Sequence, residues 1–228
     1  REYDIRGLVG KDLSERNSYI IGRAYGTFLK QHSISSAVLA RDNRLSSLSY
    51  SRAILRALCD TGIDVTDIGL ATTPLFYFAR VKYGIVGGVM VTGSHNSPEF
   101  NGFKLGFGTD TLFGEGISAL RDIAAAGIFS DGKGKVTEKN PLPSYVDEIA
   151  SRISLGPKDV FCVVDAGNGA AGPIVKQVFD RIGVKYKGLF LEPDGNFPNH
   201  HPDPTQVKNL KVLIETVKEL GADLGIAF

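Results

Sequence analysis

The sequence contains no tryptophan, one methionine and only two cysteines among its 228 residues. Cys59 and Cys162 lie far apart in apolar segments, which excludes a disulfide framework and a cysteine-based zinc site and indicates free thiols in a reducing compartment. No apolar run approaches the roughly 20 residues that cross a bilayer, and no basic-then-apolar leader opens the sequence. We therefore expect a cytoplasmic protein without a membrane partner.

Charge of one sign is also lacking. The 26 Lys and Arg residues nearly balance the 25 Asp and Glu residues, which leaves a formal net charge of +1. This balance excludes an overall basic surface for nucleic acid. An anionic ligand must therefore be held by a few placed cations rather than by the field of the whole molecule.

Glycine, in contrast, is abundant, with 27 residues, and it favours many tight strand-to-helix turns. Hydrophobic spacing predicts helices that alternate with strands. The expected helices are 18–30, 47–61, 74–83, 115–126, 145–153, 174–182 and 207–220, and the expected strands are 36–40, 64–68, 87–91, 103–107, 160–165, 185–191 and 224–228. This alternation predicts an α/β fold with mostly parallel or mixed sheets flanked by helices.

A domain boundary is expected between about residues 140 and 158, where a connection starts with KNPLP (139–143), ends with SLGPKD (154–159) and holds the expected helix 145–153 between them. We therefore expect one domain over residues 1–143 and a second over 144–228. The sequence opens on Arg1 rather than methionine and closes on an apolar segment, LGIAF, that is typical of a buried strand. We expect the second domain to be truncated and the chain to be a piece of a longer protein.

A glycine-rich turn follows the predicted strand 160–165. Residues Gly167–Gly172 fit G-x-G-x-x-G, and Glu192 follows after the next strand. This spacing is typical of a dinucleotide site, in which glycines let the backbone approach a pyrophosphate. Asp165 stands directly before the turn, where its charge would oppose a pyrophosphate. A strand-to-helix turn without a ligand is the alternative.

The most informative segment is 91–104, VTGSHNSPEFNGFK, at the end of an apolar strand. Open α/β sheets bind ligands outside the carboxyl ends of their strands. Ser94 and His95 lie in this loop, and Lys104 lies where we expect the loop to return to the next strand. A hydroxyl with a neighbouring base and a cation suits nucleophilic or phosphoryl-transfer chemistry. A polar loop with local backbone hydrogen bonds is the alternative, whereas a Ser-His-Asp hydrolase would need a G-x-S-x-G elbow.

Three arginines and two histidines outside this loop could either bind a ligand or have a structural role. Arg6, Arg41 and Arg44 suit phosphate binding, but ion pairs with Asp4 or Asp42 are the simpler interpretation. The adjacent His200 and His201, with Asp203 nearby, could bind a metal. Because prolines surround them, a rigid turn with hydrogen-bonded imidazoles is favoured.

Several motifs occur in an order that resembles the α-D-phosphohexomutases, in particular the bacterial phosphomannomutase/phosphoglucomutase group. They are EYDIRG (2–7), RDNRLSS (41–47), TTP (72–74), GGVMVTGSHNSPEFNGFKL (87–105), VDAGNGAAG (164–172) and EPDGNFPNHHPDPT (192–205). The resemblance covers essentially the whole chain. It departs from the usual T-A-S-H-N-P loop because Gly93 replaces the alanine and Ser97 replaces the proline.

The resemblance implies reversible phosphoryl transfer between C1 and C6 of a mannose or glucose phosphate, through a hexose 1,6-bisphosphate. Ser94 would be the phosphoserine and a ligand of Mg²⁺. Arg6 and Lys104 would neutralise the phosphate and help proton transfer, and His95 would be a weaker acid–base candidate.

The same resemblance implies four domains around one cleft, of which this chain would hold the first and part of the second. The main carboxylate ligands of Mg²⁺ are expected beyond Phe228, so we predict that the 228 residues alone are inactive. The glycine-rich turn becomes a structural turn. A dinucleotide-binding oxidoreductase and a sugar-phosphate-binding module without turnover are the alternatives.

Overall fold

The computed structural model describes residues 3–228, which divide into two compact units. The first unit extends to Ser94 and continues from Glu99 to Asn140, and the second comprises His95–Pro98 and Pro141–Phe228. The division after Asn140 lies three residues before the position expected from the sequence. The serine loop, residues 92–99 around Ser94, is therefore divided, because its tip (His95–Pro98) belongs to the second unit. No sequence pattern indicated this division. Residues 1 and 2 of the expected first domain lie outside the described part.

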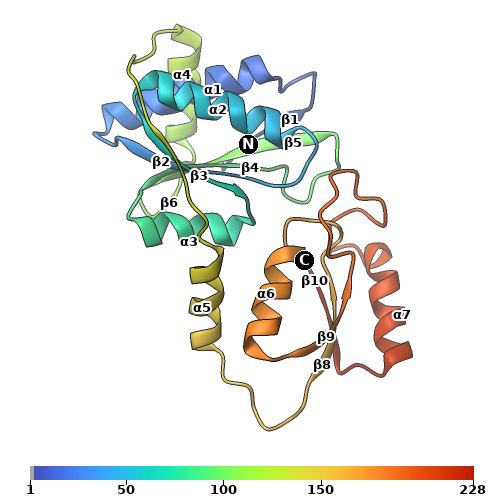
Figure 1. Cartoon of the computed structure of the whole chain (residues 1–228). Helices are drawn as coiled ribbons and strands as arrows, with labels where there is room; N and C mark the ends of the chain where they lie inside the picture. The colour runs from blue at the N-terminus through green and yellow to red at the C-terminus, as the bar shows by residue number, and fades with distance from the viewer. Residues whose placement is uncertain (1–2) are drawn as a thin grey trace. The chain divides into compact units, whose positions relative to one another are not determined.

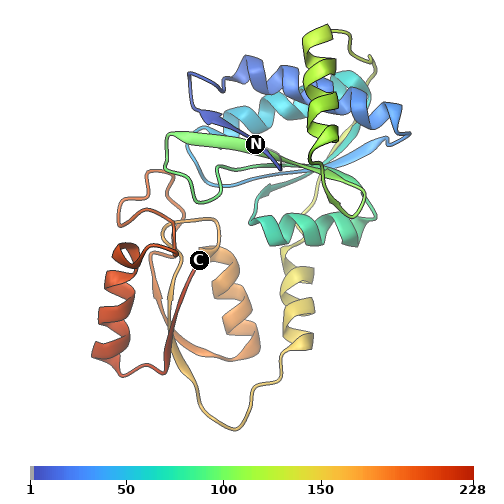
Figure 2. The same cartoon turned by 180° about the vertical axis from the view of Figure 1, so that it is seen from behind.

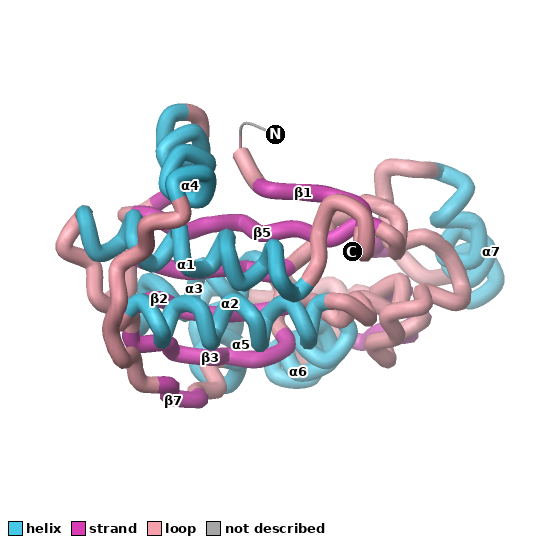
Figure 3. The backbone as a smooth tube through the Cα atoms, turned by 90° about the horizontal axis from the view of Figure 1, so that it is seen from above, coloured by secondary structure: helices cyan, strands magenta, loops and turns pink. Residues whose placement is uncertain are grey.

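The first unit is built on one mixed sheet. Its strands are β1 (Ile5–Leu8), β2 (Ser36–Arg41), β3 (Asp64–Leu70), β4 (Gly87–Val91), β5 (Phe100–Phe107), β6 (Asp110–Thr111) and β7 (Val136–Glu138). The order across the sheet is β1-β5-β4-β2-β3-β7, with β6 paired to β5, and Figure 3 shows its two edges at β1 and β7. The neighbouring pairs β4–β2, β2–β3 and β3–β7 are parallel, whereas β5 is antiparallel to both β1 and β4.

Helices cover both faces of this sheet. They are α1 (Glu15–Gln31), α2 (Ser47–Thr61), α3 (Thr73–Tyr83) and α4 (Glu115–Ala126). Figures 1 and 2 show α1, α2 and α4 on one face and α3 on the other. Helix α1 begins where the Ser14 side chain accepts a hydrogen bond from the Asn17 amide, which satisfies a donor that the first helical turn leaves unpaired.

Close approach of α1 and α2 depends on a small residue. A Cβ on Gly22 would lie 2.6 Å from the Cβ of Ala57, so glycine lets the two helices pack tightly. The sheet side of these helices is buried, with Tyr25, Leu39 and Ile54 fully excluded from solvent. This core fixes β4 and β5, which carry the serine loop between them.

The second unit contains a smaller parallel sheet. Its strands are β8 (Phe161–Asp165), β9 (Lys185–Leu189) and β10 (Leu224–Ala227), in the order β10-β8-β9. Its helices are α5 (Leu142–Arg152), α6 (Gly172–Ile182), the 3₁₀ helix η1 (Val207–Leu210) and α7 (Lys211–Leu220). Helices α6 and α7 lie on opposite faces of the sheet (Figures 1 and 2). A small core forms around Cys162, Val164 and Val175.

The predicted α/β class is confirmed, and two details of the prediction were wrong. Strand β5 begins at Phe100 rather than Phe103, so Lys104 lies in the middle of the strand and not near its start. The expected helix 207–220 is divided into η1 and α7. Strands β1, β6 and β7 were not predicted because antiparallel or edge pairing with distant residues, rather than local alternation, defines them. Over residues 3–228, no helix has the length and apolar character needed to cross a bilayer.

Candidate functional site

Ser94 stands just beyond the end of β4 in an unusual backbone conformation. Its φ is +56°, in the left-handed region that glycine and asparagine enter most readily. The Ser94 amide donates to the Thr92 hydroxyl at 2.9 Å, and the Thr92 amide donates to the Gly102 carbonyl at 2.9 Å. These bonds tie the start of the loop to β5. A strained residue held by its surroundings is typical of a functional position.

Arg44 holds the serine loop in place through hydrogen bonds to its main chain. Its side chain is almost fully buried and donates to the main-chain oxygens of Ser94 (2.8 Å) and Phe100 (3.0 Å), and it pairs with Asp42 at 3.2 Å. A Cβ on Gly93 would lie 2.6 Å from the Arg44 guanidinium carbon, so glycine at this position makes room for this side chain. The ion-pair interpretation of Arg44 is therefore confirmed.

Two further cations, Arg6 and Lys104, pair with the carboxylate of Asp4 beside this loop. Asp4 Oδ2 accepts from Arg6 Nε (2.9 Å) and Nη2 (2.8 Å), and the Lys104 ammonium lies 3.4 Å from the same oxygen. In the β1–β5 pairing, Ile5 lies opposite Phe103, and extending that register by one residue places Asp4 opposite Lys104. Asp4 and Arg6 share a face because side chains alternate along a strand. The topology therefore brings all three groups together.

The charges in this cluster influence one another. Burial disfavours ionisation of Asp4, but the hydrogen bonds and charges of Arg6 and Lys104 outweigh burial and hold its pKa below the usual value. Burial lowers the pKa of the Arg44 guanidinium, and the charge of Arg6 lowers it further, against the opposing effect of Asp42. Arg6 Nη1 also donates to the Gly93 carbonyl at 3.3 Å. The start of the serine loop is thus surrounded by positive charge.

His95 belongs to the second unit, where its imidazole is already hydrogen-bonded. Its Nδ1 donates to the Pro202 carbonyl at 2.8 Å, and the His201 Nε2 donates to the His95 carbonyl at 2.8 Å. The Nδ1 of His95 is therefore engaged, which leaves its Nε2 for any proton transfer. In the first unit, Arg6 contacts the Gly93 carbonyl next to Ser94 and is joined to Lys104 through Asp4. His95 instead lies with the 199–203 loop.

The glycine-rich turn is filled by its own side chains. The buried Asp165 accepts from the Gly167 amide (2.8 Å) and faces the His200 Nε2 at 3.0 Å, and the His200 Nδ1 faces the His201 carbonyl at 2.9 Å. A Cβ on Gly172 would lie 1.7 Å from the Leu191 carbonyl oxygen. The Gly167 amide, which a pyrophosphate would use, is occupied by a carboxylate. This packing explains the glycine spacing without a dinucleotide.

The histidines of this loop form a hydrogen-bonded turn, as the sequence favoured. Within residues 3–228, no group of three or more His, Cys, Asp or Glu side chains could hold a metal ion. The carboxylates beside the serine loop, Asp4 and Asp42, are each paired with cations, Asp4 with Arg6 and Lys104 and Asp42 with Arg44. The described residues alone therefore do not fit a magnesium site, which typically includes one or more carboxylates.

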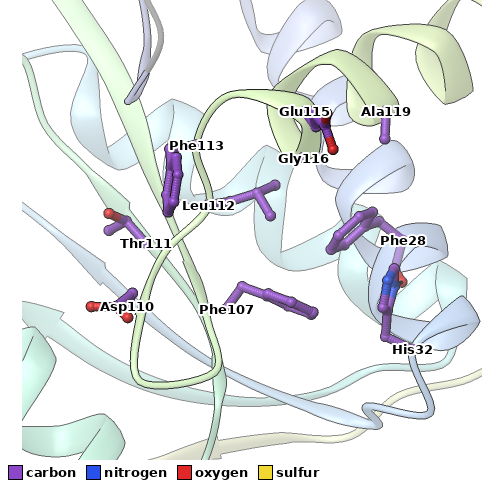
Figure 4. A pocket seen from close by; sticks show the side chains of 10 residues that line it. All are labelled: Phe28, His32, Phe107, Asp110, Thr111, Leu112, Phe113, Glu115, Gly116 and Ala119. Carbon is purple, nitrogen blue, oxygen red and sulfur yellow. Dashed lines mark hydrogen bonds between the residues drawn. The ribbon is translucent and has the colours of Figure 1, made fainter.

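A separate cavity of about 480 Å³ opens in the first unit between α1, the β5–β6 hairpin and α4. Figure 4 shows the rings of Phe28 and His32 on one side and Phe113 on the other, with Leu112 between them. Ser94, Arg6 and Lys104 do not line it. The cavity is thus distinct from the cluster around the serine loop.

Sequence reasoning underestimated two residues of this site and missed a third. The sequence indicated Asp4 only as an ion-pair partner and Arg44 as a phosphate ligand or an ion-pair partner, but not as a residue that holds the serine loop. Asn101 was not considered, although its fully buried amide donates to the Ser46 and Ser47 hydroxyls and anchors the start of β5. Spacing could have indicated Asp4, which lies two residues before Arg6. The roles of Arg44 and Asn101 depend on long-range packing that has no local signal.

Comparison with known families gives matches over both units. Residues 1–125 match the family described as "Phosphoglucomutase/phosphomannomutase, alpha/beta/alpha domain I", and residues 143–228 match its domain II. A phosphoglucomutase of Neisseria gonorrhoeae is 43% identical over 230 residues, and a phosphomannomutase/phosphoglucomutase of Pseudomonas aeruginosa PAO1 is 42% identical over 228 residues. Both alignments cover 100% of this chain and 50% and 49% of those proteins, respectively.

Solved structures agree with these matches. A phosphoglucomutase/phosphomannomutase family protein from Burkholderia thailandensis superposes with a TM-score of 0.95 at 37% identity, covering 100% of this chain and 51% of that one. The chain thus spans about half the length of the curated relatives it matches. The matches support the resemblance read from the motifs, and they give no support to a dinucleotide-binding oxidoreductase.

Proposed function

Because the chain belongs to the phosphoglucomutase/phosphomannomutase family, we propose that it carries the phosphoserine centre of a phosphohexomutase. The reaction moves a phosphoryl group between C1 and C6 of a hexose phosphate. The substrate is a mannose or glucose phosphate, and the intermediate is a hexose 1,6-bisphosphate. The observation that carries the proposal is Ser94 in a left-handed conformation next to Gly93, whose carbonyl accepts from Arg6, with Lys104 joined to Arg6 through Asp4.

Ser94 exchanges the phosphoryl group with the sugar. In the forward step, a hydroxyl oxygen of the sugar monophosphate attacks the phosphorus, and the bond from phosphorus to Ser94 Oγ breaks. The proton lost by the sugar hydroxyl is balanced by the one that Ser94 Oγ gains. After the bisphosphate turns around, the reverse step returns its other phosphoryl group to Ser94. The sugar leaves with its phosphate at the alternative carbon.

Arg6 and Lys104 supply the electrostatic stabilisation. The transferring phosphoryl group spreads negative charge over its equatorial oxygens, and catalysis comes almost entirely from positioning and from cations. Arg6 is tied to the serine loop through the Gly93 carbonyl, and Lys104 projects from β5 on the same face as Asp4. His95, through its Nε2, is a weaker candidate for moving a proton, because its Nδ1 is held by Pro202.

The family resemblance also implies Mg²⁺. When bound, the ion would neutralise phosphate charge, and Ser94 would be one of its ligands. Within residues 3–228, no cluster of suitable ligands lies ready for the ion. That the 228 residues alone do not convert hexose phosphates stays a prediction, and turnover by the isolated chain would contradict it. We propose the cytoplasm as its compartment, supported by the free thiols of Cys59 and Cys162.

A pair of serine variants tests the proposal. The variants are made in a full-length form, in which this chain is joined to the sequence that fills the second half of its relatives. In that form we expect Ser94→Ala to lose conversion of glucose 1-phosphate to glucose 6-phosphate by a factor of at least about 10³. Ser97→Ala is the matched control, since it removes a hydroxyl from the same loop, and it should retain activity. Full activity in Ser94→Ala would overturn the proposal, whereas sugar-phosphate binding without turnover in the unaltered form would favour a binding module.

A further inference from the structure

Asp4 is a buried carboxylate shared by the two cations of the proposed centre. Its exposed fraction is 5%, and one oxygen, Oδ2, faces both Arg6 and Lys104. Its other oxygen, Oδ1, is buried and accepts no hydrogen bond from the described residues. A buried acceptor without a donor is destabilising. Pairing through Oδ2 stabilises the folded state, and the unpaired Oδ1 cancels part of that gain.

We propose that Asp4 is a positioning residue that competes with the phosphoryl group for Arg6 and Lys104. This inference rests on the proposed function, because it concerns what those cations do as Ser94 gains and loses a phosphoryl group. In the structure, Asp4 holds both cations on the face of β1 and β5 that adjoins the serine loop. Its carboxylate occupies the positions on the cations that a phosphate would use.

The local charge explains why such a competitor is useful. Arg6, Lys104 and Asp4 together carry one net positive charge, whereas Arg44 is paired with Asp42. A phosphoserine carries about −1.5 to −2 charges at neutral pH. With Asp4 in place, the sign of the cluster reverses when the phosphoryl group arrives, so neither state is strongly held. Without Asp4, two uncompensated cations would bind the phosphoryl group more tightly.

Weak binding of the phosphoryl group matters for a reaction whose intermediate turns around. The bisphosphate must loosen from the centre after the first transfer and return in the opposite orientation. When Ser94 has given up its phosphoryl group, Asp4 offers Arg6 and Lys104 an alternative partner. The carboxylate thereby lowers the affinity for the bisphosphate and raises the rate of its reorientation. Interactions that hold an intermediate too tightly reduce turnover.

Kinetics of Asp4→Asn in the full-length form test this role. The amide keeps the shape and removes the charge, so we expect kcat to fall about tenfold, the scale of one partly buried charge interaction. The half-saturating concentration of glucose 1,6-bisphosphate should fall as well, by about threefold or more. Hydrolysis of the phosphorylated Ser94 by water should also become slower, and intact-mass measurement over time gives its rate. A merely structural residue would instead raise the half-saturating concentration.

Two further variants keep the test decisive. Asp4→Glu retains the charge, so the half-saturating concentration should stay near that of the unaltered form even if kcat falls. Asp122→Asn removes an exposed carboxylate on α4 that is paired with Arg121, and it should leave the half-saturating concentration unchanged.

The outcomes separate the two proposals. If Ser94 is phosphorylated and Asp4→Asn leaves the half-saturating concentration unchanged or raises it, the counter-ion role is wrong and the proposed function stands. If Asp4→Asn does not fold, Asp4→Glu decides, because a lowered half-saturating concentration there would contradict the role. If Ser94 is never phosphorylated, both proposals fall.

Discussion

Each unit places a residue with left-handed backbone in a loop after a buried strand, and the two loops differ in the charges around them. Ser94 follows β4 with φ +56°, and Asn168 follows β8 with φ +57°. Arg6, Lys104 and the buried Arg44 lie around the first loop. The second loop is occupied by the carboxylate of Asp165. The left-handed backbone conformation three residues after the strand is therefore shared, and the surrounding charges distinguish an anion-binding loop from a structural turn.

The largest effect should come from removing the imidazole that contacts the Asp165 carboxylate in the second loop. His200→Ala removes the imidazole that faces the buried Asp165 carboxylate, and loss of a hydrogen-bond partner by a buried group costs about 1–3 kcal/mol, or more for a charged group. Hydrogen exchange of β8 and β9 should report this loss as faster exchange of their amides. His201→Ala is the matched control, because the Nε2 of this adjacent residue donates to the exposed His95 carbonyl, and its loss should cost about 1 kcal/mol. Equal losses in both variants would contradict a turn held by Asp165.

Removing a cation from the first loop should affect activity rather than stability. Lys104→Met in the full-length form is expected to lower kcat by about 10² to 10³, the effect of removing one preorganised donor from a transition state. Lys176→Met, on α6 after the second loop, is the control, since its exposed ion pair with Asp180 contributes little. Similar activity in the two lysine variants would remove the functional distinction between the loops.

A substitution at the end of the second loop tests whether its glycines are structural. Gly172→Ala would force a Cβ to within 1.7 Å of the Leu191 carbonyl oxygen, and relief of such an overlap costs about 1–3 kcal/mol. Gly156→Ala is the control because no atom lies within 4 Å of the added Cβ. Chemical denaturation of both variants measures the difference. Unchanged stability of Gly172→Ala would mean that packing does not explain this glycine.

The smallest effect concerns acid stability of the first unit. The pKa of Asp4 is lower in the folded state than its ordinary value of 3.8, so its stabilisation is complete above that value. It is lost as the pH falls through the folded-state pKa. Asp4→Asn should therefore flatten the acid side of the curve of unfolding free energy against pH. Asp122→Asn, in an exposed pair with Arg121, should leave the curve unchanged, and a steeper acid side in Asp4→Asn would contradict the sign.

Local pattern predicted most helices and most parallel strands, because an apolar face repeats every 3.6 or 2 residues. It could not predict β1 or the true start of β5, since their pairing joins residues about 100 positions apart, as Ile5 with Phe103. The serine loop was identified from its residues. Asp4 as a shared counter-ion and Arg44 as a residue that holds this loop were not, because burial and distant partners define both roles.

Localisation of a phosphoryl group tests the central claim most directly. The full-length form is incubated with glucose 1,6-bisphosphate, digested and examined by tandem mass spectrometry over the peptide that contains Ser94 and Ser97. We predict one phosphoryl group, carried by Ser94, with none in the peptide containing Gly167–Gly172. Phosphate on Ser97, or an unmodified loop in a protein that turns over hexose phosphate, would contradict the assignment of Ser94 as the phosphoryl carrier.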